Sequence, residues 1–161
     1  MPRLILMRHA KSDWSGGARD HERPLNPRGY RAAAKLGDWL REQALLPDQV
    51  FCSSATRTRE TLAGLELPEE TETHFQRGLY LATHHNLLAA MRTATGETLL
   101  MIGHNPGIGW CAAEIVAEMP GHPRFGQYPT GATLVADFEV PWHEVDWGKA
   151  IARHFVVPRD L

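Results

Sequence analysis

The sequence has few cysteines and no long apolar run, and these two absences exclude several classes of protein. Cys52 and Cys111 are its only cysteines. Two thiols without a C-x-x-C spacing do not build the disulfide framework of a small secreted protein. The first apolar run covers only Leu4 to Met7, too short for the core of a signal peptide. No run approaches the roughly 18 apolar residues of a membrane span. We therefore expect a cytoplasmic protein with no membrane segment.

An excess of charge of one sign is also missing. The 17 Lys and Arg residues nearly balance the 19 Asp and Glu residues, which gives a formal net charge of −2. Such a chain has no general attraction to nucleic acid or to anionic membranes, so any anion must be bound by a local cluster. Apolar residues make up 43% of the 161 positions, and no repeat, low-complexity tract or linker interrupts them. These features predict one globular domain over residues 1–161.

What the sequence does contain is an alternation of short apolar runs and helical patterns. Asn26-Pro27 is typical of a helix start, and Ala33, Leu36 and Leu40 then share one helical face. The patterns predict strands and helices in the following order: strand Leu4–Met7, helix Tyr30–Glu42, strand Gln49–Cys52, helix Arg57–Leu65, strand Thr73–Phe75, helix His84–Ala94, strand Thr98–Ile102, helix Ile108–Glu118, and strands Ala132–Phe138 and Ala150–Val157. Strands alternating with helices predict a three-layer α/β/α fold around a mostly parallel central sheet.

Polar residues directly follow three of the predicted strands. Arg8-His9 follows the first strand, Ser53 to Arg57 follows the second, and Gly103-His104 follows the strand that ends at Ile102. In open α/β sheets, ligands bind beyond the carboxyl ends of the strands. We therefore expect these three segments to meet in one crevice.

Arg8, His9, Arg57 and His104 together have the chemistry of a phosphate site. A guanidinium group stays charged and pairs with two phosphate oxygens at once, so two of them would hold a phosphoryl group while its charge redistributes. A neutral imidazole is a nucleophile at neutral pH, because its unperturbed pKa is about 6.5. Neighbouring cations favour that neutral form. These residues predict a phosphoryl-transfer site in which His9 attacks phosphorus.

An ordered set of short motifs extends beyond these four residues. It begins with Arg8-His9-Ala10 and continues with Arg23-Pro24-Leu25, Arg28-Gly29, Ser53-Ser54-Ala55-Thr56-Arg57, Thr61, Leu79-Tyr80, Gly103-His104-Asn105-Pro106-Gly107 and Pro158-Arg159-Asp160-Leu161. The first motif is similar to the R-H-[GA] signature of the histidine phosphatase superfamily, which also contains the phosphoglycerate mutases. Within that superfamily, the set as a whole resembles the small SixA-like phosphohistidine phosphatases.

The resemblance implies a fold, a reaction and a role for each residue. The fold is phosphoglycerate mutase-like. His9 becomes transiently phosphorylated, Arg8 and Arg57 hold phosphate oxygens, and His104 donates to the transferring group. Water then hydrolyses the phosphohistidine, and neither a metal nor a cofactor is required. The implied substrate is a partner protein that carries phosphohistidine, or a small phosphorylated molecule.

A strong acid is missing at the places where other members of the superfamily carry one. Mutase-like members have a Glu after the third strand, where this chain has Gly78-Leu79-Tyr80-Leu81, and acid phosphatases have an acid after the second His, where it has Asn105. An alkoxide leaving group needs a proton, and supplying one is typically worth about 10²–10⁴-fold. A phosphohistidine protonated on its other ring nitrogen leaves as neutral imidazole. We therefore expect N–P rather than O–P substrates, and if an acid is used, Asp20 is the best candidate.

Other mechanisms and functions stay open from the sequence. The segment Cys52 to Arg57 resembles the C-x₅-R loop of cysteine phosphatases, although it is one residue short and has no glycine. A phosphatase for small phosphomonoesters would need a working acid at Asp20. A non-catalytic phosphate-binding adaptor would need only the arginines, so an intact His9 argues against it. No H-E-x-x-H or Cys/His spacing indicates a metal site.

Overall fold

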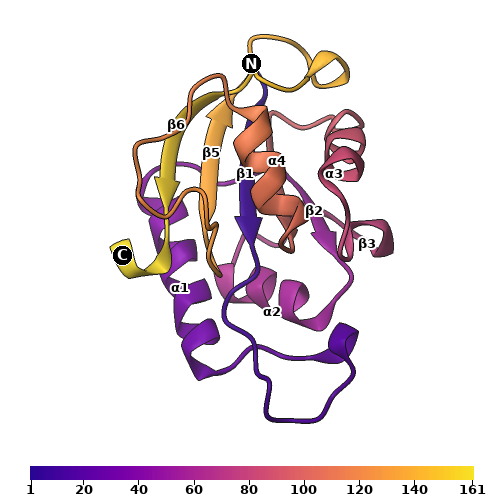
Figure 1. Ribbon diagram of the computed structural model, residues 1–161, viewed down its shortest axis with the longest axis vertical. Helices are drawn as coiled ribbons and strands as arrows, with labels where there is room; N and C mark the ends of the chain where they lie inside the picture. Colours follow the sequence, from indigo (N-terminus) through magenta and orange to yellow (C-terminus); the bar gives the residue numbers. More distant parts are fainter.

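The computed structural model describes all 161 residues, and a six-stranded sheet lies at its centre (Figure 1). The strands are β1 (Arg3–Arg8), β2 (Gln49–Ser53), β3 (Glu72–Gln76), β4 (Thr98–Gly103), β5 (Thr133–Asp137) and β6 (Ile151–Val156). They lie in the order β3-β2-β4-β1-β5-β6. Strand β5 is antiparallel to both of its neighbours, and the remaining pairs are parallel. The prediction of a mostly parallel sheet is confirmed.

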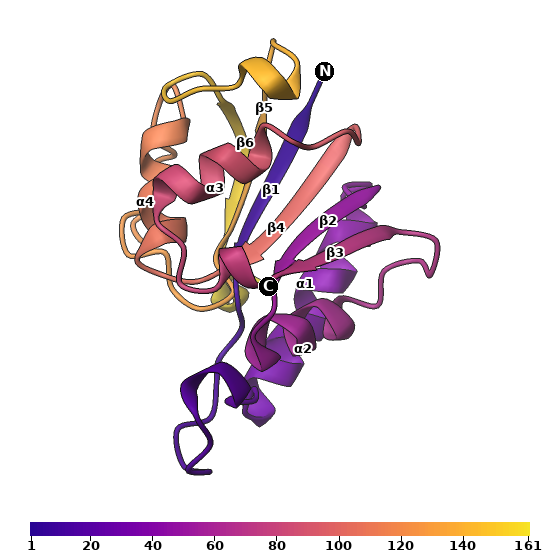
Figure 2. The same ribbon diagram turned by 90° about the vertical axis from the view of Figure 1, so that its right-hand side faces the viewer.

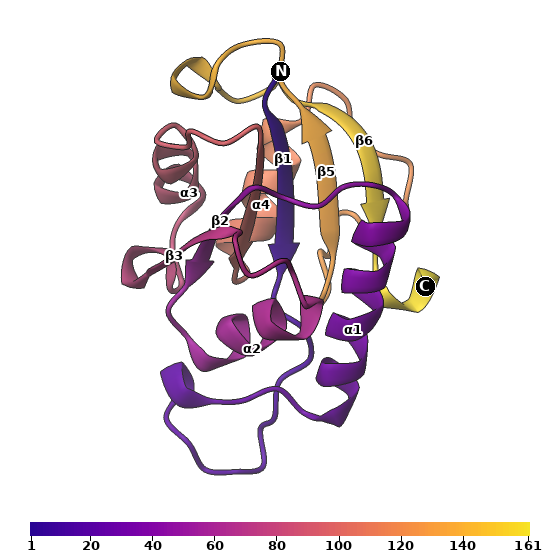
Figure 3. The same ribbon diagram turned by 180° about the vertical axis from the view of Figure 1, so that it is seen from behind.

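Helices cover both faces of the sheet, as the three-layer prediction requires. They are α1 (Pro27–Glu42), α2 (Thr56–Leu65), α3 (His84–Met91) and α4 (Gly107–Ile115). Helices α3 and α4 lie on one face (Figure 2), whereas α1 and α2 lie on the other (Figure 3). No helix combines the length and the apolar character needed to span a bilayer.

The apolar run of β1 supplies both hydrophobic cores because successive side chains of a strand point to opposite faces. Leu4 and Leu6 belong to the larger core, which packs against α3 and α4. Ile5 and Met7 belong to the smaller core, which packs against α1 and α2. This burial on both faces explains why the strand reads as a continuous apolar run rather than as an alternating pattern.

Helix α1 begins as the sequence predicts. The side chain of Asn26 accepts a hydrogen bond from the backbone N–H of Gly29 at 2.8 Å, and Pro27 is the first helical residue. Helix α4, by contrast, ends at Ile115 and not at Glu118. Val116 is already extended and forms a parallel bridge with Ala150, so its backbone pairs beside the sheet rather than within a helix.

The parallel strands direct the predicted polar segments to one edge of the sheet. Arg8 at the end of β1 is in register with Gly103 at the end of β4, and Ser53 ends β2 beside them. The segment that joins β1 to α1 extends beyond this edge (Figure 1). The carboxyl edge of the sheet is therefore where the candidate site assembles.

Candidate active site

His9 is the first residue after β1 and is held between neighbouring segments. Its backbone N–H donates to Gly103, and its backbone oxygen accepts from Gly131. The imidazole is 5% exposed, and its Nδ1 lies 2.7 Å from the backbone oxygen of Ala10. Because a carbonyl oxygen can only accept, this contact places the ring proton on Nδ1 and leaves the lone pair on Nε2.

The surroundings of His9 keep its ring neutral. Burial first, and then the charges of Arg8, Arg57 and Arg23, lower the pKa of His9 from 6.5 to about 3, against the opposing hydrogen bond to Ala10. A neutral imidazole with a free Nε2 lone pair is therefore available over the whole range of physiological pH. This is the protonation state that nucleophilic attack requires.

His104 lies beside His9, with 5.3 Å between the ring centroids. Its Nε2 is 2.8 Å from the hydroxyl of Ser53, and this hydroxyl accepts a hydrogen bond from the backbone N–H of Ala55. Ser53 can donate its proton to Nε2, and in that tautomer the proton of His104 lies on Nδ1. Nδ1 is buried and has no partner in the protein. His104 accordingly presents an unused N–H donor next to His9.

Arg8 and Arg57 bring two positive charges to the same place. Arg57 is the second residue of α2 and is only 3% exposed. The Arg57 guanidinium carbon lies 5.9 Å from the centre of the Tyr80 ring, which packs against His104. Burial first, and then the charge of Arg57, lower the pKa of Arg8. Arg8 donates one hydrogen bond, 3.3 Å long, to the backbone oxygen of Tyr128. The four residues predicted to form the site, Arg8, His9, Arg57 and His104, therefore do converge.

The buried polar atoms without a partner are concentrated in this cluster. They are Arg8 Nε, Arg23 Nε, Arg57 Nε and His104 Nδ1. Buried polar groups in proteins nearly always have a hydrogen-bond partner, so each exception calls for an explanation. All four atoms are donors, and the arginines carry positive charge. An anion with several oxygens, such as a phosphoryl group, would satisfy them.

Asp20 binds Arg57 through both its backbone and its side chain. Its backbone oxygen accepts from Arg57 Nη1 at 2.7 Å, and its carboxylate lies 3.2 Å from Arg57 Nη2 and 3.2 Å from Arg23 Nη2. The hydroxyl of Tyr80 also donates to this carboxylate. The Tyr80 hydrogen bond first, and then Arg23 and Arg57, lower the pKa of Asp20 to about 2. The carboxylate is ionised at neutral pH, which argues against the expectation that Asp20 supplies a proton.

Three further residues of the site were not singled out as functional by the sequence reasoning. Ser53 orients His104, as described above. The rings of Tyr80 and His104 pack nearly perpendicular to each other, with 5.4 Å between their centroids. Arg23 is buried and stacks on Trp14, with its guanidinium carbon 3.6 Å from the ring centroid. Each belongs to one of the short motifs described above, but its role depends on a contact that forms only when the chain folds.

Cys52 is not placed to act as a thiolate nucleophile. It is fully buried in the smaller core, and burial raises its pKa to about 12. A thiol with such a pKa is protonated at neutral pH and is a poor nucleophile. No group of three or more His, Cys, Asp or Glu side chains is arranged to hold a metal ion.

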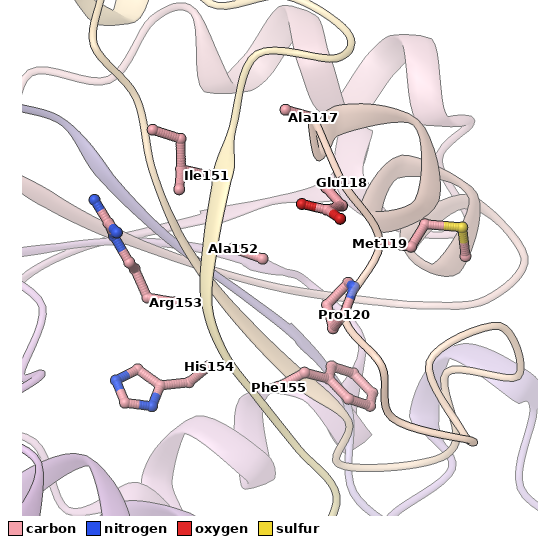
Figure 4. A pocket seen from close by; sticks show the side chains of 9 residues that line it. All are labelled: Ala117, Glu118, Met119, Pro120, Ile151, Ala152, Arg153, His154 and Phe155. Carbon is pink, nitrogen blue, oxygen red and sulfur yellow. The ribbon is translucent and has the colours of Figure 1, made fainter.

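A cavity away from these residues lies along the outer edge of β6 (Figure 4). It has a volume of about 460 Å³ and is lined by residues 117–120 and 151–155. None of the residues that converge on His9 contributes to it. Cavity size alone would therefore point away from the chemistry, and the unpaired donors around His9 are the better guide to the site.

The two site histidines predict how stability depends on pH. Burial is the main cause that lowers the pKa of both His9 and His104 to about 3, whereas the unfolded value is about 6.5. Between these values the unfolded chain binds protons that the folded chain does not, so stability should fall as pH falls. Each histidine contributes up to about 1.4 kcal/mol per pH unit. The free energy of unfolding, measured with urea between about pH 6.5 and 4.5, should fall less steeply with falling pH in His104→Gln than in the wild type. An equal dependence on pH in the two proteins would contradict this assignment.

Comparison with known proteins identifies the family of the chain. The family model described as histidine phosphatase superfamily (branch 1) matches residues 4–80. An uncharacterized protein of Mycobacterium tuberculosis is 36% identical over 163 residues, which cover 95% of this chain and 100% of that protein. A candidate phosphohistidine phosphatase SixA from Nakamurella multipartitia is 30% identical, with a TM-score of 0.87 over 98% of this chain and 96% of that one. A structure of the protein histidine phosphatase SixA with tungstate shares the fold at 20% identity, with a TM-score of 0.79 over 98% of both chains. The chain belongs to the histidine phosphatase superfamily, as a SixA-like phosphatase.

Proposed function

We propose that this protein hydrolyses phosphohistidine on a partner protein through a covalent phospho-His9 intermediate. One observation carries the proposal: the free Nε2 of a neutral His9 lies among buried donors of Arg8, Arg57 and His104 that have no partner in the protein. A nucleophile and a vacant set of anion donors in one place are what phosphoryl transfer needs.

In the first step, the Nε2 lone pair of His9 attacks phosphorus and forms an N–P bond. The N–P bond of the substrate breaks, and its electron pair returns to the substrate imidazole. Arg8 and Arg57 bind the equatorial oxygens, and the Nδ1–H of His104 donates to one of them. The proton on His9 Nδ1 stays in its hydrogen bond to Ala10, which holds the ring in place.

In the second step, water attacks the phosphorus of phospho-His9. The Nε2–P bond breaks, its electrons return to His9 as the lone pair, and both protons of the water leave with inorganic phosphate as H2PO4−. The phosphorylated ring is cationic, since Nδ1 keeps its proton, and it leaves as neutral imidazole. The low pKa of His9 makes that departure favourable.

The same argument favours a phosphohistidine substrate over a phosphoester. An alkoxide leaving group needs an acid, but Asp20 is ionised and Tyr80 already donates its proton to Asp20. A substrate imidazole protonated on its second nitrogen needs no acid. The lack of a protonated acid beside His9 therefore supports N–P cleavage.

We further propose that the reaction needs no metal and takes place in the cytoplasm. The positive charge that a metal would bring to a phosphoryl group is supplied by Arg8 and Arg57. Cys52 and Cys111 are both buried free thiols, which suits a reducing compartment.

The experiment that tests the proposal traps the intermediate. The protein is mixed with a phosphohistidine peptide, quenched in base within the first turnover, and mapped by mass spectrometry. We expect an acid-labile, base-stable phosphate on His9, and no turnover of the same peptide with phosphoserine in place of phosphohistidine. Phosphoserine turnover at a similar rate would instead support a general phosphomonoesterase. Binding of the phosphopeptide with no phosphate transfer would support an adaptor.

A further inference from the structure

A second cluster of positive charge lies beside the catalytic end of the sheet. Four basic side chains line a cavity of about 140 Å³, which we call the basic pocket; they are Lys11, Arg28, Arg124 and Arg159. No acidic residue lines this cavity. The chain as a whole carries a net charge of −2, so the basic pocket is a local reversal of its overall charge.

The four side chains of the basic pocket are not used inside the protein. None of them donates a hydrogen bond or forms an ion pair, unlike Arg3, which is bound to Asp137. The charge of Arg124 helps to lower the pKa of Asp160, after the hydrogen bond from Val157, but Asp160 Oδ2 is held at 2.9 Å by both the backbone N–H of Val157 and the ring of His122. The cations of the basic pocket therefore remain available for an external anion.

The basic pocket borders the catalytic residues through two short connections. Lys11 follows His9 by two residues, so their Cα atoms are at most about 7.6 Å apart. Thr130, also in the pocket wall, precedes Gly131, whose N–H donates to the backbone oxygen of His9 at 2.9 Å. Arg28 lies in the first turn of α1, and Arg159 lies in the C-terminal segment, which ends beside α1 (Figure 3).

We propose that the basic pocket binds carboxylate side chains that flank the phosphohistidine of the partner protein. This inference rests on the proposed function and deepens it by naming the chemistry of the partner. Three arginine forks and an ammonium group pair well with carboxylates. Because the rest of the chain is slightly acidic, an acidic partner is steered to this edge and oriented by it.

The form of the basic pocket fits an acidic protein segment better than a compact second phosphate. Lys11, Arg28 and Arg159 are exposed, and only Arg124 is half-buried. A compact dianion is bound tightly by buried, fixed donors, whereas exposed long side chains adapt to carboxylates spread along a segment. An extended chain rises about 3.3 Å per residue, so acidic residues two to four positions from the phosphohistidine lie about 7 to 13 Å from it.

Two peptides that differ only in charge test this proposal. One carries glutamates at the four positions on each side of phosphohistidine, and the other carries glutamines there. We expect the wild type to show a kcat/KM about tenfold higher for the glutamate peptide, with the advantage shrinking as salt is raised. The double substitution Arg28→Glu with Arg159→Glu should remove the advantage. Arg28→Glu places negative charge in the first turn of α1, where it is tolerated.

The matched control makes the same change of charge away from the pocket. Lys35→Glu with Lys149→Glu alters two basic residues that bind no other side chain, and it should leave the preference intact. Phosphoramidate, a small N–P substrate, should be hydrolysed equally by all variants. Equal turnover of both peptides by the wild type would overturn the basic pocket proposal alone. A preference that survives Arg28→Glu with Arg159→Glu would do the same. Failure to hydrolyse phosphoramidate and both peptides would instead overturn the proposed function.

Discussion

Replacing His9 by Asn should lower kcat for phosphohistidine hydrolysis by about 10⁴-fold or more. The asparagine amide can still donate to the backbone oxygen of Ala10, but its nitrogen lone pair is delocalised into the carbonyl and cannot attack phosphorus. The remaining donors of Arg8, Arg57 and His104 would bind the phosphoryl group without transferring it. The affinity for a phosphopeptide should therefore change far less than kcat. Release of inorganic phosphate, together with binding by calorimetry, separates the two quantities.

The control for His9→Asn is His143→Asn. The side chain of His143 is 77% exposed and follows β5 at the opposite edge of the sheet, so this variant should keep wild-type activity. Both variants should unfold in urea with one cooperative transition. Turnover that persists within tenfold in His9→Asn would overturn the covalent mechanism and redirect attention to a water nucleophile.

The fold follows from the sequence because its strands are short and their apolar runs are continuous. Each expected strand is present, with both of its ends within one residue of the prediction. Two helices end earlier than expected. Helix α3 stops at Met91 rather than at Ala94, because local bonds from the N–H groups of Thr93 and Ala94 to Ala90 and Met91 tighten its last turn. Helix α4 stops at Ile115 because Val116 pairs with Ala150, which lies more than 30 residues further along the chain. No local pattern in residues 108–118 carries that information.

The residues of the candidate site could be predicted from the sequence, but their protonation states could not. Arg8, His9, Arg57 and His104 lie directly after strands or at a helix start, and parallel pairing alone brings them together. The proton position on His104 depends instead on the hydroxyl of Ser53, 51 residues away. Asp20 could be named from the sequence as a carboxylate near the site. Its charge state could not, because Tyr80, Arg23 and Arg57 set it only after folding.

The basic pocket could not be predicted from the sequence, because it also depends on contacts between distant segments. Its four cations stand at positions 11, 28, 124 and 159, far apart in the sequence. The net charge of the chain does not reveal them, and none of them belongs to a run of basic residues. Only the packing of the C-terminal segment against α1 turns scattered surface charges into one concave cluster.

Replacing Arg57 by Ala should lower kcat/KM by about 10²–10³-fold. Arg57 is buried, and two of its nitrogens now bind Asp20, while Nε has no partner. Arg57→Lys should recover only part of the loss, because a lysine cannot bind two phosphate oxygens with a planar fork. Arg59→Ala is the control from the same helix: Arg59 is exposed and donates to the backbone of Ser54, so its loss should change kcat/KM by less than about twofold.

The pairing of Arg57 with Asp20 makes this prediction sharper. In the free protein the Asp20 carboxylate holds the guanidinium that a phosphoryl group needs, so substrate binding has to share or displace it. Asp20→Asn removes the competing charge and should lower the Kd for inorganic phosphate by about tenfold, with kcat for phosphohistidine within about tenfold of the wild type. In an Arg57→Ala background, Asp20→Asn should have little effect on phosphate binding, because the guanidinium for which Asp20 and phosphate compete is absent. If Asp20 were the general acid, Asp20→Asn would instead lower kcat by about 10²–10⁴-fold whether or not phosphate bound more tightly. The double-mutant cycle measures phosphate binding by calorimetry and kcat by phosphate release. It therefore decides whether Asp20 competes with phosphate for Arg57 or acts as the general acid.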